Sequence, residues 1–337
     1  MNDLANTVSV NGTVANSTLA DGSFAATVSP SSSMSESLNQ LKWTVAERCT
    51  DAAQRIGKPL LFGMTTSLML QAVPLPASHD LEPDILHTVA SSHRQRIRST
   101  KVSTQAHVWR NLDANARVRI NKHVYALDLM HTWAQLANHT SLESLVILGD
   151  AIITAISKQP SLRQGRSPDI IYQEMAELVT ALPRFNAKPA CMLALPLIRP
   201  YVDSPKESEC RLTLARYGVP QPAIQHVVSD VTFRNGAAVT LDMAWPEFRV
   251  ALEYDGDQHR TDKAQWRRDQ EKRERLRHHN WAIIIATAAN LADEPSRAEL
   301  AYLVGRQLAL RGAECAFRLT AAPIEQVARA EMKARQR

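Results

Sequence analysis

Thr240 to His259 reads Thr-Leu-Asp-Met-Ala-Trp-Pro-Glu-Phe-Arg-Val-Ala-Leu-Glu-Tyr-Asp-Gly-Asp-Gln-His, and its alternation of apolar and polar side chains predicts two β-strands. Pro246 has no backbone N–H to give to a ladder, so we expect a tight turn at residues 245–247 between the strands. Gly256 ends the second strand and allows a sharp exit of the chain.

Side chains alternate between the two faces of a strand, which divides this stretch into an apolar and an acidic side. The apolar side consists of Val239, Leu241 and Met243 on the first strand and Val250, Leu252 and Tyr254 on the second. The opposite side holds Asp242 on the first strand, and Glu253 and Asp255 on the second. Three carboxylates therefore converge on one face of a predicted hairpin.

Carboxylates this close repel each other unless a cation lies among them. Clustered carboxylate oxygens suit hard divalent cations, so the pattern indicates a Mg²⁺ (or Mn²⁺) site formed by Asp242, Glu253 and Asp255. His259 lies just beyond and is placed to act as a base or to bind an anion. The other interpretation of the same pattern is the polar, solvated face of an ordinary antiparallel hairpin.

The whole chain has the composition of a soluble globular protein. It has 337 residues, 45% hydrophobic and 22% charged, which is enough for two domains. The net charge of +5 is compatible with a nucleic-acid partner without requiring one. No run of about 18 apolar residues occurs, so we expect no membrane span.

The four cysteines, Cys49, Cys191, Cys210 and Cys315, form no Cys-x-x-Cys or Cys/His cluster. This spacing argues against a structural zinc site and against a disulfide framework, and it favours a reduced, cytoplasmic protein.

The chain before residue 203 predicts a mainly helical domain with a small sheet. Residues 1–34 are poor in bulky apolar and charged side chains and read as a disordered tail. Helices are expected at 35–56, 65–71, 127–136, 141–156, 167–182 and 189–202, the last interrupted by Pro196. Strands are expected at 60–62, 85–90, 102–108 and 118–125.

A domain boundary is predicted at residues 203–205. Ser204 is a helix N-cap, Pro205 occupies the first helical position, and Glu207 follows as in a capping box. A strand at 224–231, an Asn235-Gly236 turn, the hairpin, a helix at 262–279, a strand at 282–286 and a helix from 295 follow. We therefore expect an α/β (α+β) protein with a helical domain at 35–202, a second domain at 203–318 and a tail at 319–337.

The second domain resembles a known family. The stretches that support the resemblance are Ser-Pro-Lys-Glu-Ser (204–208), Leu-Asp-Met-Ala-Trp-Pro-Glu (241–247), Val-Ala-Leu-Glu-Tyr-Asp-Gly-Asp-Gln-His (250–259), Arg-Arg-Asp (267–269) and Asn-Trp (280–281). They are similar to an uncharacterised bacterial domain related to the Vsr-like endonucleases of the restriction-endonuclease-like PD-(D/E)XK superfamily. More faintly, 61–76 and 118–153 resemble AbiEi-type antitoxins of type IV toxin–antitoxin systems, although the winged-helix start of that family is not evident.

This resemblance implies a restriction-endonuclease-like αβββαβα fold and hydrolysis of phosphodiesters in nucleic acid, with DNA expected. Asp242 and Glu253, with the main-chain carbonyl of Tyr254, would hold Mg²⁺, and Glu207 would reach the site from the first helix. The superfamily usually has a lysine two residues after the second-strand acid, where this chain has Asp255. Either His259 takes over as the base or Asp255 is a third metal ligand.

The long helix supplies the expected nucleic-acid contacts, from Arg267, Arg268, Lys272 and Arg273. Two functions remain open from the sequence. One is a metal-dependent endonuclease with Glu207, Asp242, Glu253, Asp255 and His259 as the site. The other is a non-catalytic nuclease fold kept for nucleic-acid binding or regulation in a defence or toxin–antitoxin setting.

Overall fold

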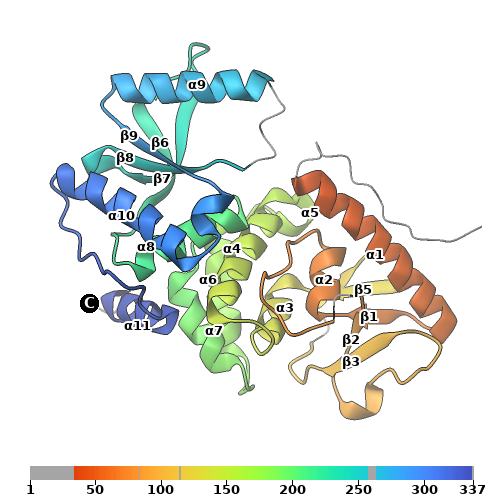
Figure 1. Ribbon diagram of the computed structural model, residues 1–337. Coiled ribbons are helices and arrows are strands. Elements are labelled where there is room, and N and C mark those ends of the chain that lie inside the picture. Colours follow the sequence, from red (N-terminus) through yellow and green to blue (C-terminus); the bar gives the residue numbers. More distant parts are fainter. Residues whose placement is uncertain (1–33, 83, 114, 257–262, 336–337) are drawn as a thin grey trace, which may run out of the picture.

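The computed structural model describes residues 34–335, except residues 83, 114 and 257–262, and it is an α/β protein with two separate sheets (Figure 1). The first sheet belongs to the N-terminal half of the chain and the second to the C-terminal half, with helices between them.

The first sheet has five strands in the order β3-β2-β1-β5-β4. The strands are β1 (Leu60–Phe62), β2 (Leu86–Ala90), β3 (Thr104–Val108), β4 (Arg117–Arg119) and β5 (Val124–Leu127). β1 is parallel to β5, β2 is parallel to β3, and the β1–β2 and β4–β5 pairs are antiparallel.

The single strand expected at 118–125 is wrong, because the chain turns back within it. Val118 pairs with Ala126 across an antiparallel hairpin. The Asn121 side chain closes the turn by accepting hydrogen bonds from the backbone N–H groups of His123 and Val124. A side chain that bonds its own backbone two residues on is a turn signal that outweighs the β-propensity around it.

Helices cover both faces of the first sheet. α1 (Met34–Ile56) packs on one face over Leu60, Phe62 and Val124. On the other side lies a larger cluster to which the following helices contribute. These helices are α2 (Met64–Leu70), α3 (Leu129–Leu136), α4 (Leu142–Lys158), α5 (Pro160–Arg163), α6 (Pro168–Ala181) and α7 (Lys188–Ala194), with short 3₁₀ turns at His93–Gln95 (η1) and Leu195–Leu197 (η2).

The helix expected at 189–202 is too long. α7 and its 3₁₀ turn end at Leu197, one residue after Pro196. The N–H of Arg199 then donates to the Asp150 carboxylate (2.7 Å) instead of to a helical carbonyl. A buried acceptor on α4 thus competes with continuation of the helix.

The order helix, three strands, helix, strand, helix predicted after residue 203 is confirmed. The elements are α8 (Pro205–Arg216), β6 (Ala223–Thr232), β7 (Ala238–Trp245), β8 (Val250–Tyr254), α9 (Lys263–His278), β9 (Ala282–Ala286) and α10 (Glu294–Leu310), with 3₁₀ turns at Pro246–Phe248 (η3) and Ala288–Leu291 (η5). α11 (Ile324–Arg335) follows and packs against the N-terminal helices.

The second sheet has the order β6-β7-β8-β9, antiparallel except for the parallel β8–β9 pair. Both of its faces are covered. α8 and α10 pack against Met243, Trp245 and Leu252, and α9 lies across the opposite face (Figure 1). Next to the carboxylates that opposite face is apolar, where Ala244 and Ala251 meet Leu276 of α9.

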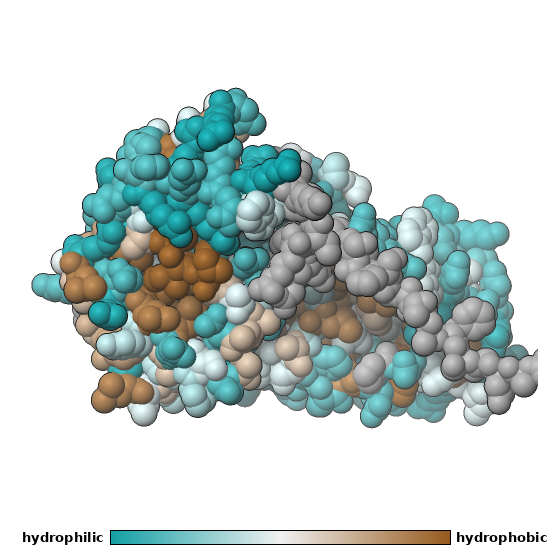
Figure 2. Space-filling model, turned by 45° about the horizontal axis from the view of Figure 1, so that its top comes forward, coloured by the Kyte–Doolittle hydropathy of each residue, from teal (hydrophilic) through white to brown (hydrophobic). Residues whose placement is uncertain are grey.

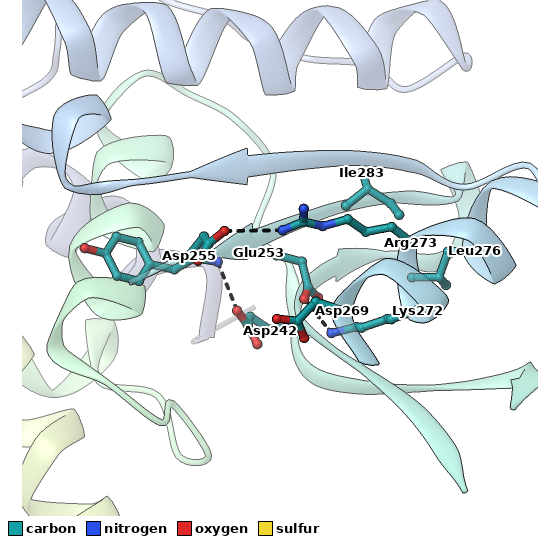
Figure 3. Close-up of a pocket in the computed structure, with 9 residues that line it drawn as sticks. Asp242, Glu253, Asp255, Asp269, Lys272, Arg273, Leu276 and Ile283 are labelled. Carbon is teal, nitrogen blue, oxygen red and sulfur yellow. Dashed lines mark hydrogen bonds and ion pairs between the residues drawn. The ribbon is translucent and has the colours of Figure 1, made fainter. Parts of the chain in front are cut away.

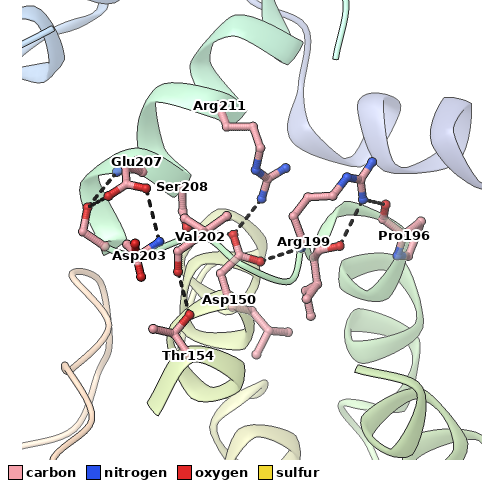
Figure 4. Close-up of polar contacts among 12 residues, drawn as sticks. Asp150, Thr154, Pro196, Arg199, Val202, Asp203, Glu207, Ser208 and Arg211 are labelled. Atoms are coloured by element: carbon pink, nitrogen blue, oxygen red, sulfur yellow. Dashed lines mark hydrogen bonds and ion pairs between the residues drawn. The ribbon is translucent and has the colours of Figure 1, made fainter. Parts of the chain in front are cut away.

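A buried polar cluster joins the two halves at α4 and α8 (Figure 4). Asp150 and Arg211 form an ion pair (2.7 Å) in which each side chain is 1% exposed. The Ser208 hydroxyl donates to the same carboxylate (2.7 Å). The predicted boundary at residue 203 is therefore bridged by charges that water does not reach.

None of the helices described between residues 34 and 335 is long and apolar enough to cross a membrane. All four cysteines are free thiols.

Candidate functional site

Asp242 and Glu253 lie directly opposite each other on β7 and β8. The ladder pairs Met243 with Leu252 and Ala244 with Ala251, and continuing this register by one residue pairs the two acids. Residues opposite each other in an antiparallel pair have Cβ atoms about 5 Å apart, and like charges there are destabilising. The hairpin predicted from the sequence thus produces the expected pair of carboxylates.

Backbone N–H groups orient both carboxylates. The N–H of Tyr254 donates to Asp242 Oδ2 (3.0 Å), and the N–H of Asp242 donates to Glu253 Oε1 (3.3 Å). Because each donor belongs to the strand ladder, the two side chains are fixed by the sheet itself.

Lys272 of α9 supplies a cation to this pair. Its Nζ forms a hydrogen-bonded ion pair with Glu253 Oε2 (Figure 3), and both side chains are 16% exposed. The sequence contains no lysine two residues after Glu253, but the fold brings one to the same carboxylate from a helix on the covered face.

Negative charge in the pair is only partly compensated by Lys272. Burial is the main cause that raises the pKa of Glu253 to about 7, followed by repulsion from Asp242. Burial also raises the pKa of Asp242, against the lowering effects of the Tyr254 N–H and of Lys272. Both carboxyl groups are thus harder to ionise than on a solvated hairpin face, and a cation bound to them would favour their charged forms.

Asp255 points to a different partner. Arg273 Nη2 lies 3.3 Å from its Oδ2, while Asp242 and Glu253 face Lys272 and Asp269 (Figure 3). The structure therefore pairs Asp255 with an arginine, and among the described residues it does not join Asp242 and Glu253 as the expected third metal ligand.

Glu207 forms the capping box that its spacing predicts. Its Oε1 accepts from the Ser204 hydroxyl (2.8 Å), its Oε2 accepts from the Asp203 N–H (3.2 Å), and its own N–H donates to the Ser204 hydroxyl (Figure 4). Burial and then repulsion from Asp242 raise the pKa of Glu207 to about 7. Glu207 does not line the cavity described next, so its link to Asp242 is electrostatic.

A cavity of about 200 Å³ opens between the sheet and α9 at this point. Its lining residues are Asp242, Glu253, Tyr254, Asp255, Asp269, Lys272, Arg273, Leu276 and Ile283. Asp269 was not predicted as a site residue. The sequence pattern that could have indicated it is helical spacing. Asp269, Lys272, Arg273 and Leu276 are three or four positions apart and so lie on one face of a helix.

The four basic residues expected to contact nucleic acid divide into two pairs. Lys272 and Arg273 turn into the cavity, each onto a carboxylate. Arg267 and Arg268 are exposed, and the Arg268 guanidinium lies 4.6 Å from the centre of the Phe233 ring. His259, the expected base, lies outside the described residues.

The described carboxylates of the cavity can hold a divalent cation only as a pair. Among the residues that the structure describes, no three His, Cys, Asp or Glu side chains are arranged to hold a metal ion. Asp242 and Glu253, opposite each other on β7 and β8, offer adjacent carboxylate oxygens. Mg²⁺ keeps several waters and is commonly bound by one or two carboxylates together with substrate phosphates, so this pair fits Mg²⁺.

Comparison with known proteins gives two relatives, the uncharacterized proteins MT2308 and Rv2248 of Mycobacterium tuberculosis strains CDC 1551 and H37Rv. Each is 30% identical over 114 residues, a stretch that covers 34% of this chain and 40% of the relative. No family model and no solved structure matches the chain. The chain is thus similar to part of two proteins whose names state no activity.

Proposed function

We propose that the C-terminal half is a Mg²⁺-dependent (or Mn²⁺-dependent) DNA endonuclease of the Vsr-like, PD-(D/E)XK kind, acting in the cytoplasm. The observation that supports this most is the Asp242–Glu253 pair, half-buried and directly opposed, in a cavity that four carboxylates and only two cations line. The αβββαβα order around it agrees with the fold that the sequence resemblance implies.

Asp242 of β7 and Glu253 of β8 would hold the metal. When bound, Mg²⁺ would polarise the scissile phosphate and lower the pKa of an attacking water. The two backbone N–H donors, of Tyr254 and Asp242, keep the carboxylates in place without a substrate. Preorganised ligands of this kind cost little reorganisation when the reaction starts.

Lys272 takes the role of the lysine that the sequence lacks at residue 255. Its ammonium contacts Glu253 from α9, next to the carboxylates that would hold the metal. In this position the ammonium would hold a phosphate oxygen or orient the water. Arg267 and Arg268, exposed on the same helix, would contact the nucleic-acid backbone.

One observation favours the second candidate, a non-catalytic nucleic-acid-binding or regulatory protein in a defence or toxin–antitoxin context. Glu253 and Asp255 already have internal cation partners in Lys272 and Arg273. In that case the ion pairs replace a metal permanently. The faint AbiEi-like resemblance of the first half belongs to this alternative.

Calorimetric titration of Mg²⁺ and Mn²⁺ at pH 6.5 separates the two candidates. Because the pKa of Glu253 is raised to about 7, metal binding there releases protons, and the measured heat depends on the ionisation enthalpy of the buffer. Plasmid nicking is followed on the same samples. The variants are Asp242→Asn and Glu253→Gln, and the control is Asp230→Asn, an exposed acid paired with Arg249.

We expect proton-linked binding and nicking in the wild type and in Asp230→Asn, and neither in the two site variants. Metal binding without nicking supports a regulatory site. Absence of metal binding in the wild type rules out the proposed nuclease.

A further inference from the structure

β9 is an edge strand of the second sheet, and half of its backbone groups face away from the protein. The Ala282 N–H donates to the Arg249 carbonyl (2.8 Å), and the Asp255 N–H donates to the Ala286 carbonyl (2.8 Å), so the even-numbered residues bond to β8. By alternation, the N–H and C=O groups of Ile283 and Ile285 point outward. Within the described residues no strand pairs with this edge.

Within the part of the chain that the structure describes, this edge lacks the features that usually prevent a free strand from pairing with another chain. Its sequence is Ala-Ile-Ile-Ile-Ala, without a charge or a proline, and its first four residues are partly exposed. Soluble proteins normally protect such edges with Lys, Pro, a bulge or a covering element. Figure 2 shows a hydrophobic area directly below the hydrophilic surface at the upper left, where Figure 1 has β9 and α10 below α9.

We propose that β9 pairs antiparallel with β9 of a second copy of this chain, about a two-fold axis at Ile284. The strand reads the same in both directions, so Ala282 meets Ala286 and Ile283 meets Ile285 of the other copy. Because the outward groups belong to residues 283 and 285, these pairs exchange four hydrogen bonds, and Ile284 meets its own copy at the non-hydrogen-bonded position. A closed, self-complementary contact of this kind is what a two-fold dimer requires.

Side chains of α10 would also meet their own copies in this dimer, because the helix lies along β9. Arg311, just after the helix, donates to the Asn280 carbonyl (2.7 Å) just before β9, so the helix and the strand run in opposite directions. Measured from the Arg311–Asn280 hydrogen bond, Leu303 lies about 12 Å away along the helix axis and Ile284 about 13 Å away along the strand. Leu303 and Ile284 therefore lie at about the same height along the sheet. Leu303 is 38% exposed, so its side chain is accessible to the other copy.

The charges on α10 are arranged for an antiparallel contact about Leu303. Glu299, Leu303, Arg306 and Leu310 form an exposed stripe at helical spacing. In two antiparallel copies of the stripe, Glu299 of one faces Arg306 of the other, and this pairing occurs twice. In the described part of the chain neither side chain forms an ion pair of its own. A two-fold axis perpendicular to the sheet also places both Asp242–Glu253 cavities on one face of the joined sheet.

Sedimentation equilibrium of the full chain tests the dimer directly. The decisive variants exchange the charges of Glu299 and Arg306. Glu299→Arg and Arg306→Glu each place like charges opposite each other twice, and the double variant restores both pairs. We expect a dimer in the wild type, a dissociation constant raised at least about tenfold in each single variant, and recovery to within about threefold in the double variant. Glu177→Arg, an exposed acid on α6, is the matched control and should not change the constant.

The substituted residues are exposed, so circular dichroism should show an unchanged fold in all variants. A wild type that remains monomeric up to about 100 μM overturns the proposal. A dimer that the single variants leave unchanged, or that the double variant fails to restore, also overturns it, because the contact would then lie elsewhere.

Discussion

Replacing Glu253 by Gln removes one charge from the half-buried Asp242–Glu253 pair and keeps the shape of the side chain. The folded-state pKa of Glu253 is about 7, above the value of 4.5 that it has when unperturbed. A carboxyl group with a raised folded-state pKa stabilises the fold in its protonated form. That contribution is complete below pH 4.5 and is lost as the pH rises through about 7.

The size of this effect follows from the two pKa values. At about 1.4 kcal/mol per pKa unit, the interval between 4.5 and about 7 corresponds to about 3 kcal/mol. The free energy of unfolding of the wild type, relative to the variant, should therefore fall by about 3 kcal/mol between pH 4.5 and pH 8. The raised pKa of Asp242 lowers the stability of both proteins over this range, so it largely cancels in the difference.

Urea unfolding of wild type and Glu253→Gln, measured at a series of pH values between 4.5 and 8.5 with chelator present, gives this difference. Loss of the carboxylate that accepts from the Asp242 N–H adds an offset that does not depend on pH, so the slope is the quantity to compare. Glu247→Gln, an exposed acid in the turn between the same strands, is the control, and its curve should run parallel to that of the wild type.

Saturating Mg²⁺ should reverse the fall in the wild type and leave Glu253→Gln unaffected. A ligand that binds the folded state at 100 times its dissociation constant stabilises it by about 2.7 kcal/mol. If wild type and Glu253→Gln have parallel stability curves across this pH range, Glu253 does not ionise there, and the reasoning for a cation site at this pair is refuted.

Three further predictions concern the packing that supports the site. Asp150→Ala should lower the free energy of unfolding by about 3–5 kcal/mol in urea titrations, because it leaves the 1% exposed Arg211 charged and unpaired; a loss below about 1 kcal/mol would contradict a buried ion pair. Gly149→Ala should cost about 1–3 kcal/mol in thermal unfolding, because its Cβ would lie 2.4 Å from Ile198 Cδ1; an unchanged melting temperature would mean that Ile198 moves freely. Gly218→Ala should cost more than Gly149→Ala in the same assay, because φ is +79° and the new Cβ would lie 2.2 Å from a backbone carbonyl, which cannot rotate away as a side chain can.

Local sequence patterns were sufficient to predict the helices and strands of the second domain. The period-two alternation and the Pro246 turn predict β7 and β8 and place Asp242 opposite Glu253, because register in a tight hairpin is set by its turn. The turn predicted at Asn235-Gly236 forms with Gly236 in the left-handed region, at a φ of +80°.

The composition of the cavity could not be predicted from local patterns. α9 is charged on nearly every face, so its sequence does not indicate which side meets the sheet. The contact of Leu276 with Ala244 and Ala251 fixes the rotation of the helix. That rotation turns Lys272 and Arg273 inward and leaves Arg267 and Arg268 exposed.

The sequence thus specified which residues form strands, turns and caps, because these depend on neighbours within a few positions along the chain. Sheet order, the free edge of β9 and the ion pair between Lys272 and Glu253 required the tertiary structure. They join residues that lie far apart in the chain, and their arrangement depends on which apolar faces pack together. The Asp150–Arg211 pair at the junction of the two halves also required the tertiary structure, because its two residues are 61 positions apart in the sequence.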